Sequence, residues 1–310
     1  MKILIADDDR VSRRLLEAVL VKLGHQVIVV TEGASALSAL LEADAPRLAI
    51  LDWQMPDLDG LAVCRAVRAQ APEYAYILLL TSMHRQEDRT LAYEAGVDDF
   101  LNKPLDVSDL RSRLRVGERV LDLQAKLLQA QAVLRHQATH DHLTGLWNRR
   151  MILDTLARAL ETAIEEQQPI AVALADIDHF KQINDKHGHA AGDAVLRETA
   201  DRMRAVLRAQ DAIGRYGGEE FLLVLPDCDP GAAVSVLERA RMGVVGRPVD
   251  AGHVSLEVSV SAGVAWASAR VESSALVQAA DEALYRAKAG GRNRVEGQPV
   301  HPSSPGNHLT

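Results

Sequence analysis

The residues best suited to chemistry lie in the stretch Arg215-Tyr216-Gly217-Gly218-Glu219-Glu220-Phe221, which an apolar run follows. Two short strands joined by Gly217-Gly218 are typical of a β-hairpin, because paired glycines accept the positive φ angles of a tight turn. Glycines also leave no side chain at the tip, so the phosphates of a ligand could approach the backbone closely. Glu219 and Glu220 follow at once, and strand alternation points them to opposite faces.

A third carboxylate, that of Asp176, lies upstream of the hairpin. It directly follows the apolar run 170–175, which reads as a buried strand, so Asp176 is expected at the carboxyl end of that strand. Hard cations such as Mg²⁺ take carboxylate, carbonyl and phosphate oxygens together. Asp176 beside a glutamate of the hairpin therefore predicts a divalent cation site for a nucleoside triphosphate.

Three further carboxylates occur in the first half of the chain. Asp7 and Asp8 follow the run 3–6, and Asp52 follows the run 48–51. Clustered carboxylates repel one another unless a cation neutralises them, and Mg²⁺ is the natural partner. One of them could then attack a phosphoryl group and form an aspartyl phosphate, while Thr81 and Lys103 stabilise its oxygens. Asp9 and Asp57, in contrast, are expected only to cap a helix or a turn.

The elements that position these acids alternate regularly. Apolar runs at 3–6, 27–30, 48–51, 77–80 and 100–101 alternate with amphipathic stretches such as 11–23 and 61–69. This pattern predicts a doubly wound (βα)5 domain with a parallel sheet. Ligands of such sheets bind at the carboxyl ends of the strands, which is where the acids, Thr81 and Lys103 fall.

A long helical pattern follows Pro104. Its apolar positions alternate four and three residues apart, at Val116, Val120, Leu123, Leu127, Ala130 and Leu134. This heptad seam favours a parallel coiled coil between two copies of the chain, over about 107–140. The alternative is a single amphipathic helix packed on its own domain.

The second domain is expected to open with a turn at 141–145 and a helix capped by Asn148. Its strands and helices suggest an α/β sheet of the palm type that nucleotide cyclases and polymerases use. Asn184 can donate to the carbonyl of guanine and Asp193 can accept from its N–H groups, so this pair suits guanine better than adenine.

Residues 1–122 resemble the receiver domain of two-component response regulators, on the pattern Leu51-Asp52-Trp53-Gln54-Met55-Pro56-Asp57-Leu58-Asp59-Gly60 with Asp7-Asp8, Thr81-Ser82 and Lys103-Pro104. The resemblance implies Asp52 as the phosphoacceptor, phosphorylated by a sensor histidine kinase. It implies Asp8, Asp52 and the Gln54 carbonyl as Mg²⁺ ligands, with Asp7 acting through water. Thr81 and Lys103 would contact the phosphoryl group, Phe100 would be the aromatic switch residue, and Lys103-Pro104 would be a cis peptide.

Residues 141–295 resemble the GGDEF family of diguanylate cyclases, on the Gly-Gly-Glu-Glu-Phe motif, Asp176 to Lys181 and the opening Asp141 to Arg150. These enzymes condense two GTP into cyclic di-GMP. The resemblance implies Mg²⁺, or Mn²⁺ in its place, held by Asp176, the Ile177 carbonyl and Glu219. Glu219 would be the general base, and Glu220 would assist the metal. Lys181 would stabilise the transferring phosphate, and Asn184 and Asp193 would bind the base with His189 alongside.

Two more segments match that family. Leu284 to Asn293 resembles its closing motif, in which Lys288 and Arg292 would contact phosphate oxygens. Arg208-Ala209-Gln210-Asp211 matches its R-x-x-D product-inhibition motif, with Arg239 as a candidate partner. The plain alternative for the second segment is an ordinary ion pair at a helix end.

Length, charge and composition limit the classes of protein that this chain can belong to. The 310 residues suffice for two domains, and the net charge of −8 argues against a nucleic-acid-binding surface. Cys64 and Cys228 fall in different domains, so a reducing cytoplasm fits better than a disulfide framework. The short apolar start is no signal peptide, and no run reaches the length of a membrane span. The tail 296–310 is rich in Pro and Ser and is expected to be disordered.

The leading interpretation is a phosphorylation-regulated diguanylate cyclase that works as a homodimer, joined through its receiver and coiled coil. The alternative is a non-enzymatic signalling module that binds only GTP or cyclic di-GMP. A DNA-binding response regulator would need a basic output domain, which this chain lacks. A cyclase that makes another dinucleotide also fits the residues.

Overall fold

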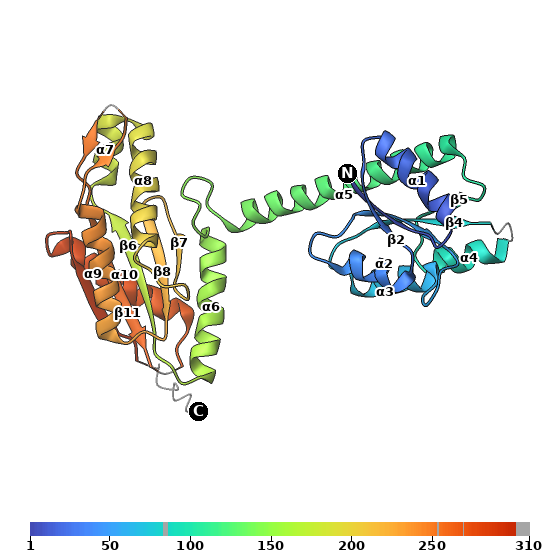
Figure 1. Cartoon of the computed structure of the whole chain (residues 1–310). Coiled ribbons are helices and arrows are strands. Elements are labelled where there is room, and N and C mark those ends of the chain that lie inside the picture. The colour runs from blue at the N-terminus through green and yellow to red at the C-terminus, as the bar shows by residue number, and fades with distance from the viewer. Residues whose placement is uncertain (83–85, 253, 269, 302–310) are drawn as a thin grey trace. The chain divides into compact units, whose positions relative to one another are not determined.

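A computed structural model describes residues 1–82, 86–252, 254–268 and 270–301. The chain divides into two compact units, residues 1–132 and 133–310, which are described separately (Figure 1).

The first unit is a parallel sheet in the order β2-β1-β3-β4-β5. Its strands are β1 (Lys2–Ala6), β2 (Gln26–Val30), β3 (Leu48–Asp52), β4 (Tyr76–Thr81) and β5 (Asp99–Asn102). Its helices are α1 (Arg10–Lys22), α2 (Gly33–Leu41), α3 (Gly60–Gln70), α4 (Gln86–Glu94) and the start of α5 (Val107–Thr139). Buried apolar side chains form one core on each face of the sheet. All five predicted strands are therefore confirmed, and the doubly wound prediction with them.

Local signals explain where the helices of this unit begin. Asp9 caps α1, with its carboxylate accepting from the backbone N–H groups of Val11 and Ser12, and Asp59 caps α3 in the same way. Asp57 adopts a left-handed φ of 64° in the turn before α3. Asp9 and Asp57 thus have the structural roles that the sequence predicts for them.

Helix α5 changes character along its 33 residues. Leu110, Leu114, Gly117 and Leu121 are buried against the sheet of the first unit, and a Cβ at Gly117 would lie 2.7 Å from the Tyr76 ring. Beyond them the seam residues Leu123, Leu127 and Leu134 are 55%, 59% and 64% exposed. The first part of α5 therefore belongs to the first unit, and the pairing of the exposed seam with a second copy stays a prediction.

The second unit is built on a sheet in the order β12-β11-β6-β8-β7. Its strands are β6 (Ile170–Ile177), β7 (Ala212–Arg215), β8 (Glu220–Pro226), β11 (Val260–Ala267) and β12 (Val295–Pro299), and only the β11–β12 pair is parallel. A small antiparallel ribbon joins β9 (Val249–Asp250) to β10 (Ser255–Leu256).

Helices cover both faces of this sheet. The core on one face holds residues of α6 (Arg149–Glu165) and α10 (Ser273–Ala289). The core on the other holds residues of α7 (Phe180–His187), α8 (His189–Arg204) and α9 (Pro230–Val245). Along β6, residues 170, 172 and 174 face the first core and residues 171, 173 and 175 the second. Strand alternation therefore places Asp176 on the side of α6 and α10.

Two sequence expectations are wrong in this unit. Val295–Pro299 forms strand β12 beside β11, so the tail is ordered at least as far as Pro299, although disorder was expected from Glu296. Neither Gly217 nor Gly218 has a positive φ, so the hairpin does not use the left-handed conformations that paired glycines permit. The rest of the tail, 302–310, lies outside the described residues. No helix in the described part of the chain is long and apolar enough to cross a membrane.

Candidate functional sites

The first site lies at the carboxyl ends of β1, β3 and β5. Ligand oxygens of Asp7, Asp8 and Asp52 all lie within 4.8 Å of one another, and Asp7 is fully buried. Lys103 Nζ lies 2.7 Å from Asp52 Oδ2 and 3.6 Å from Asp7 Oδ1. These side chains converge as the strand-end argument predicts, and their oxygen-rich donor set fits Mg²⁺.

The electrostatics of this site follow from burial. Burial raises the pKa of the Asp52 carboxyl, and the hydrogen bond from Lys103 offsets only part of that rise. Burial alone would lower the pKa of Lys103, but its hydrogen bond to Asp52 and the neighbouring carboxylate charges raise it overall. A cation would relieve the remaining repulsion among the carboxylates.

A cavity of about 230 Å³ opens beside Asp52, lined also by Asp8, Trp53, Gln54, Thr81, Ser82 and Lys103. The cavity borders Asp52, whose side chain is otherwise buried. Phe100 is buried and packs edge-on against Tyr93, with ring centroids 5.0 Å apart. The Lys103-Pro104 peptide is cis.

Two hydrogen bonds to Asp7 in the first site were not predicted from the sequence. Ser12 Oγ donates to Asp7 Oδ2 over 2.5 Å, and Arg13 Nη1 donates to the Asp7 carbonyl over 2.7 Å. Both residues lie in the first turn of α1, directly after the acidic pair, which was the available signal.

The second site lies at the carboxyl end of β6. The β6–β8 register pairs Asp176 with Glu220, so their side chains share the face that α6 and α10 cover. Glu219 lies in the bend before β8, and its carbonyl accepts a hydrogen bond from Ile177 N over 3.3 Å. The sequence placed Glu219 at the metal and Glu220 in support, whereas the register gives the position facing Asp176 to Glu220.

Lys288 links α10 to this site. Its Nζ lies 2.8 Å from Asp176 Oδ2. Burial raises the pKa of Asp176, and Lys288 offsets part of the rise. Burial first and the charge of Asp176 second also raise the pKa values of Glu219 and Glu220. The three carboxylates therefore lie within electrostatic range of one another and would be stabilised by a bound divalent cation.

At the tip of the hairpin, the Glu220 carboxylate lies close to the backbone of Gly217. A Cβ at Gly217 would lie 2.3 Å from Glu220 Oε2, whereas a Cβ at Gly218 would meet open space. Arg215 Nη2 donates to the Gly218 carbonyl over 2.6 Å, and Nη1 lies 3.2 Å from Asp141 Oδ2. Gly217 therefore leaves room for the Glu220 carboxylate. Arg215 connects the tip of the hairpin to the turn at 141–145, which we call the entry turn.

Helices α7 and α8 bring the expected base-binding residues together. Asn184 on α7 approaches α8 so closely that a Cβ at Gly192 would lie 2.0 Å from Asn184 Oδ1. Asp193 follows Gly192 and is half-buried, and His189 is exposed at the start of α8. Lys181 is exposed on α7, with no hydrogen bond or ion pair to the described residues.

Asp178 has a structural role. Its buried carboxylate accepts from Ser259 Oγ over 2.6 Å, from Ser261 Oγ over 2.7 Å and from Asn293 N over 3.1 Å. It therefore fastens the closing motif to the end of β6. Arg292, which precedes Asn293, is exposed with a left-handed φ of 62°.

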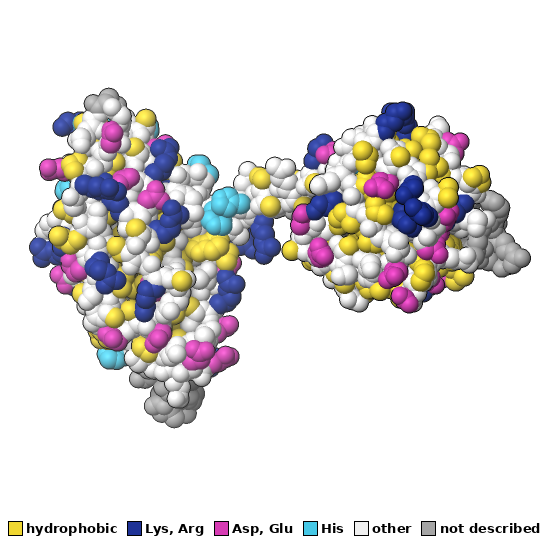
Figure 2. All heavy atoms as spheres, viewed as in Figure 1, with side chains coloured by type: hydrophobic (Ala, Val, Ile, Leu, Met, Phe, Trp, Pro, Cys, Tyr) yellow, Lys and Arg dark blue, Asp and Glu magenta, His cyan; other side chains and the backbone are white. Residues whose placement is uncertain are grey.

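The R-x-x-D turn is an internal ion pair. Arg208 Nη2 lies 3.2 Å from Asp211 Oδ1, beside a cavity of about 360 Å³. Arg239 is exposed on α9, and no contact joins it to this pair among the described residues. Figure 2 shows other Lys and Arg side chains over the face that carries α8 and α9.

Both units match known families. Residues 3–115 match the response regulator receiver domain, and residues 138–294 match the diguanylate cyclase GGDEF domain. The chain therefore belongs to the GGDEF diguanylate cyclase family, with an N-terminal receiver domain.

Among its relatives is the response regulator PleD of Caulobacter vibrioides, 35% identical over 306 residues, which cover 96% of this chain and 66% of PleD. The chain thus spans about two thirds of the length of that relative. The crystal structure of the coiled coil and GGDEF domain of Caulobacter crescentus DgcB, in complex with c-di-GMP, is 33% identical with a TM-score of 0.55 over 60% of this chain and 98% of that one. Diguanylate cyclase SiaD of Pseudomonas aeruginosa, in complex with its activator SiaC, is 35% identical with a TM-score of 0.52 over 69% of this chain and 78% of that one.

Proposed function

We propose that this chain is a phosphorylation-regulated diguanylate cyclase, which condenses two GTP into cyclic di-GMP and two diphosphates. The observation that carries the proposal is the convergence of Asp176, Glu220 and Lys288 at the carboxyl end of β6. Asp176 is buried and Glu220 half-buried, and carboxylates with raised pKa values at the end of a strand are typical of a site that works on a cation-bound phosphate.

In this proposal each site holds one GTP. Asn184 and Asp193 bind the guanine edge, with His189 alongside, while Lys288, Arg292 and Lys181 neutralise the phosphate oxygens. Gly217 and Gly218 let the nucleotide approach the hairpin backbone. Asp176, Glu220 and the Ile177 carbonyl would hold Mg²⁺ or Mn²⁺, which when bound neutralises charge on the triphosphate.

The bond-forming step needs two subunits, because the product contains two equivalent linkages. Glu219 accepts the proton of the 3′-hydroxyl of one GTP. That oxygen bonds to the α-phosphorus of the GTP in the facing subunit, and diphosphate leaves in line. The exposed seam of α5 suits a coiled coil that brings the two sites face to face.

In this proposal the receiver domain controls the rate of cyclic di-GMP formation. A sensor histidine kinase would supply the phosphoryl group to Asp52, beside which Lys103 and Thr81 would contact its oxygens. The added charge of about −1.5 to −2 would rearrange this end of the sheet, including Phe100, and change how two receivers pair.

The Arg208–Asp211 turn is proposed as the site where the product inhibits. Arg208 is exposed and pairs with the buried Asp211 carboxylate beside a cavity, so a guanine base and a phosphate could take over the partners of this internal ion pair. Arg239 would contribute only if binding brings it closer.

The decisive experiment incubates the purified chain with GTP and Mg²⁺ and separates the products by chromatography. Cyclic di-GMP and diphosphate in a ratio of one to two are expected. GTP that binds without turnover, with wild-type receiver and beryllium fluoride present, would instead support the non-enzymatic binding module. ATP in place of GTP tests the base preference.

A further inference from the structure

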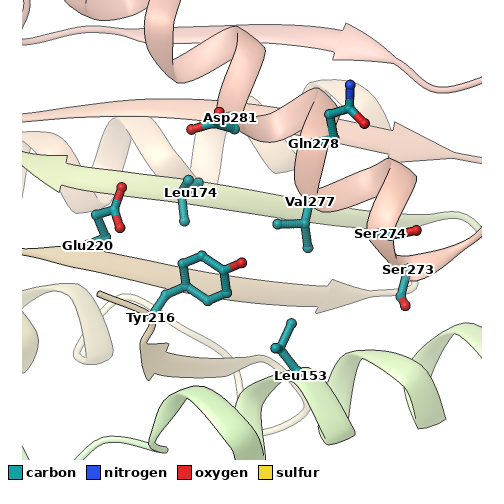
Figure 3. A pocket seen from close by; sticks show the side chains of 9 residues that line it. All are labelled: Leu153, Leu174, Tyr216, Glu220, Ser273, Ser274, Val277, Gln278 and Asp281. Atoms are coloured by element: carbon teal, nitrogen blue, oxygen red, sulfur yellow. The ribbon is translucent and has the colours of Figure 1, made fainter. Parts of the chain in front are cut away.

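A large cavity lies on the α6–α10 side of the catalytic sheet, directly behind Glu220 (Figure 3). Its volume of about 620 Å³ falls within the range of small-molecule pockets, which is roughly 300–1,000 Å³. None of the residues assigned above to guanine or phosphate binding lines it. The cavity therefore has room for a ligand other than the substrate.

Its lining combines apolar and polar side chains from separate elements, with Ser273, Ser274 and Gln278 of α10 along one side. Leu153 of α6, Leu174 of β6 and Val277 of α10 surround the space, and the Tyr216 ring points into it (Figure 3). The Arg149 guanidinium lies 4.6 Å from the centroid of the same ring. An aromatic ring braced by an arginine beside aliphatic walls suits a flat apolar body.

The two charged residues that line the cavity are both acidic. Glu220 and Asp281 project from facing elements at the same end of the cavity (Figure 3). The charges of Lys288 and of Arg149, which lies over the Tyr216 ring, offset part of the negative charge around Glu220. Lys288 is already paired with Asp176, and Asp281 forms no ion pair with the described residues.

We propose that this cavity binds a small organic cation, whose flat apolar body lies between Leu174 and Val277 and whose N–H groups meet Glu220 and Asp281. An amidinium or guanidinium fits best, because its planar donors match a carboxylate. The bound cation draws Glu220 away from the site that Asp176 and Glu220 share, and therefore competes with the divalent cation. The binding site itself does not depend on the proposed function, whereas the effect on turnover does.

Calorimetric titration of the full chain without nucleotide tests the site. Benzamidine is the probe, and benzamide, its neutral isostere, is the control. Benzamidine is expected to bind, and benzamide to bind about tenfold more weakly or not at all, because charge-assisted hydrogen bonds are the stronger ones. Asp281→Asn should weaken benzamidine about five- to tenfold, and Val277→Trp, which fills the cavity, should abolish binding. Exposed Glu282 on the same helix gives the matched control, Glu282→Gln, which should bind as the wild type does.

Equal affinity for benzamide and benzamidine, or an affinity unchanged in both Asp281→Asn and Val277→Trp, would overturn the proposal. For the effect on turnover, benzamidine should raise the Mg²⁺ concentration that gives half the maximal rate, in the wild type but not in Val277→Trp. A Mg²⁺ dependence that benzamidine leaves unchanged would contradict the competition. If the chain does not turn over GTP at all, the proposed function fails, and the calorimetry still decides whether the cavity is a cation site.

Discussion

At the scale of single residues, the two glutamates of the hairpin occupy different positions. Glu220 faces Asp176 across the β6–β8 ladder, whereas Glu219 lies in the bend before β8. Asp176 and Glu220 are partners in the strand register, so their side chains lie on the same face of the sheet. We therefore assign the divalent cation to Asp176 and Glu220, and the proton of the 3′-hydroxyl to Glu219.

Kinetics of Glu219→Gln and Glu220→Gln test this assignment. Glu219→Gln should lower kcat by about 10²–10⁴, the usual contribution of a general base, with little change in Mg²⁺ dependence. Glu220→Gln should instead raise the Mg²⁺ requirement, because it removes a charged ligand. Initial rates measured across a Mg²⁺ titration distinguish the two, with Glu282→Gln on α10 as a control. The reverse pattern would exchange the two roles.

At the scale of elements, the entry turn connects the linker helix to the catalytic hairpin. Asp141 accepts from Thr144 and pairs with Arg215, which also donates to the Gly218 carbonyl. Burial alone would raise the pKa of Asp141, but the hydrogen bonds from Thr144 and Arg215 lower it below 3.8. This carboxylate therefore stabilises the fold at neutral pH.

Asp141→Asn should lower the thermal stability of the catalytic unit at pH 7. Because the pKa is lower in the folded state, the stabilisation is present above the unfolded value near 3.8 and is lost as pH falls through the folded value. The difference in melting temperature between wild type and variant should therefore shrink below about pH 4. A difference that persists undiminished at pH 2.5 would show that the charge of Asp141 is not the cause.

The exposed half of α5 allows a test of the proposed coiled coil. Leu127→Glu places a charge on the seam and should dissociate the dimer, which analytical ultracentrifugation measures, with parallel loss of turnover. Leu128→Glu is the matched control, because Leu128 is 55% exposed against 59% for Leu127 but lies outside the heptad seam. Equal effects of the two variants, or none, would favour the single-helix alternative.

The elements best predicted from the sequence are those in which apolar residues recur regularly. The five receiver strands are short apolar runs between amphipathic helices, so their order along the chain and the meeting of Asp7, Asp52 and Lys103 follow from topology. Strand β12 gave no such signal, since Val-Glu-Gly-Gln-Pro neither alternates nor is apolar, and it forms only because the edge of β11 pairs with it. The ties of Asp178 to Ser259, Ser261 and Asn293 span 81 to 115 residues, beyond the reach of any local pattern.

At the scale of the whole molecule, one helix belongs to the receiver at its start and leads directly into the catalytic unit. Leu110 and Leu114 are buried in the receiver core, and the helix ends at Thr139, two residues before Asp141. The proposed control by the receiver would therefore act through this helix.

Beryllium fluoride, a phosphate mimic, should raise both the dimer fraction and the rate of cyclic di-GMP formation. The expected cause is a phosphoryl-like group on Asp52 within reach of Lys103 and Thr81. Sedimentation and turnover are measured together, and Asp52→Asn, which cannot hold the group, should respond in neither. Activation that survives in Asp52→Asn would place the control elsewhere.

The most direct test of catalysis between two facing sites is subunit mixing. Wild-type chains are mixed with an equal amount of Asp176→Asn chains under conditions that allow exchange, and the rate of cyclic di-GMP formation per total chain is compared with that of the wild type alone. Random pairing leaves about one quarter of the dimers with two intact sites, so the rate should fall to about one quarter. A rate of about one half would mean that each subunit works alone, and would contradict a reaction between two facing sites.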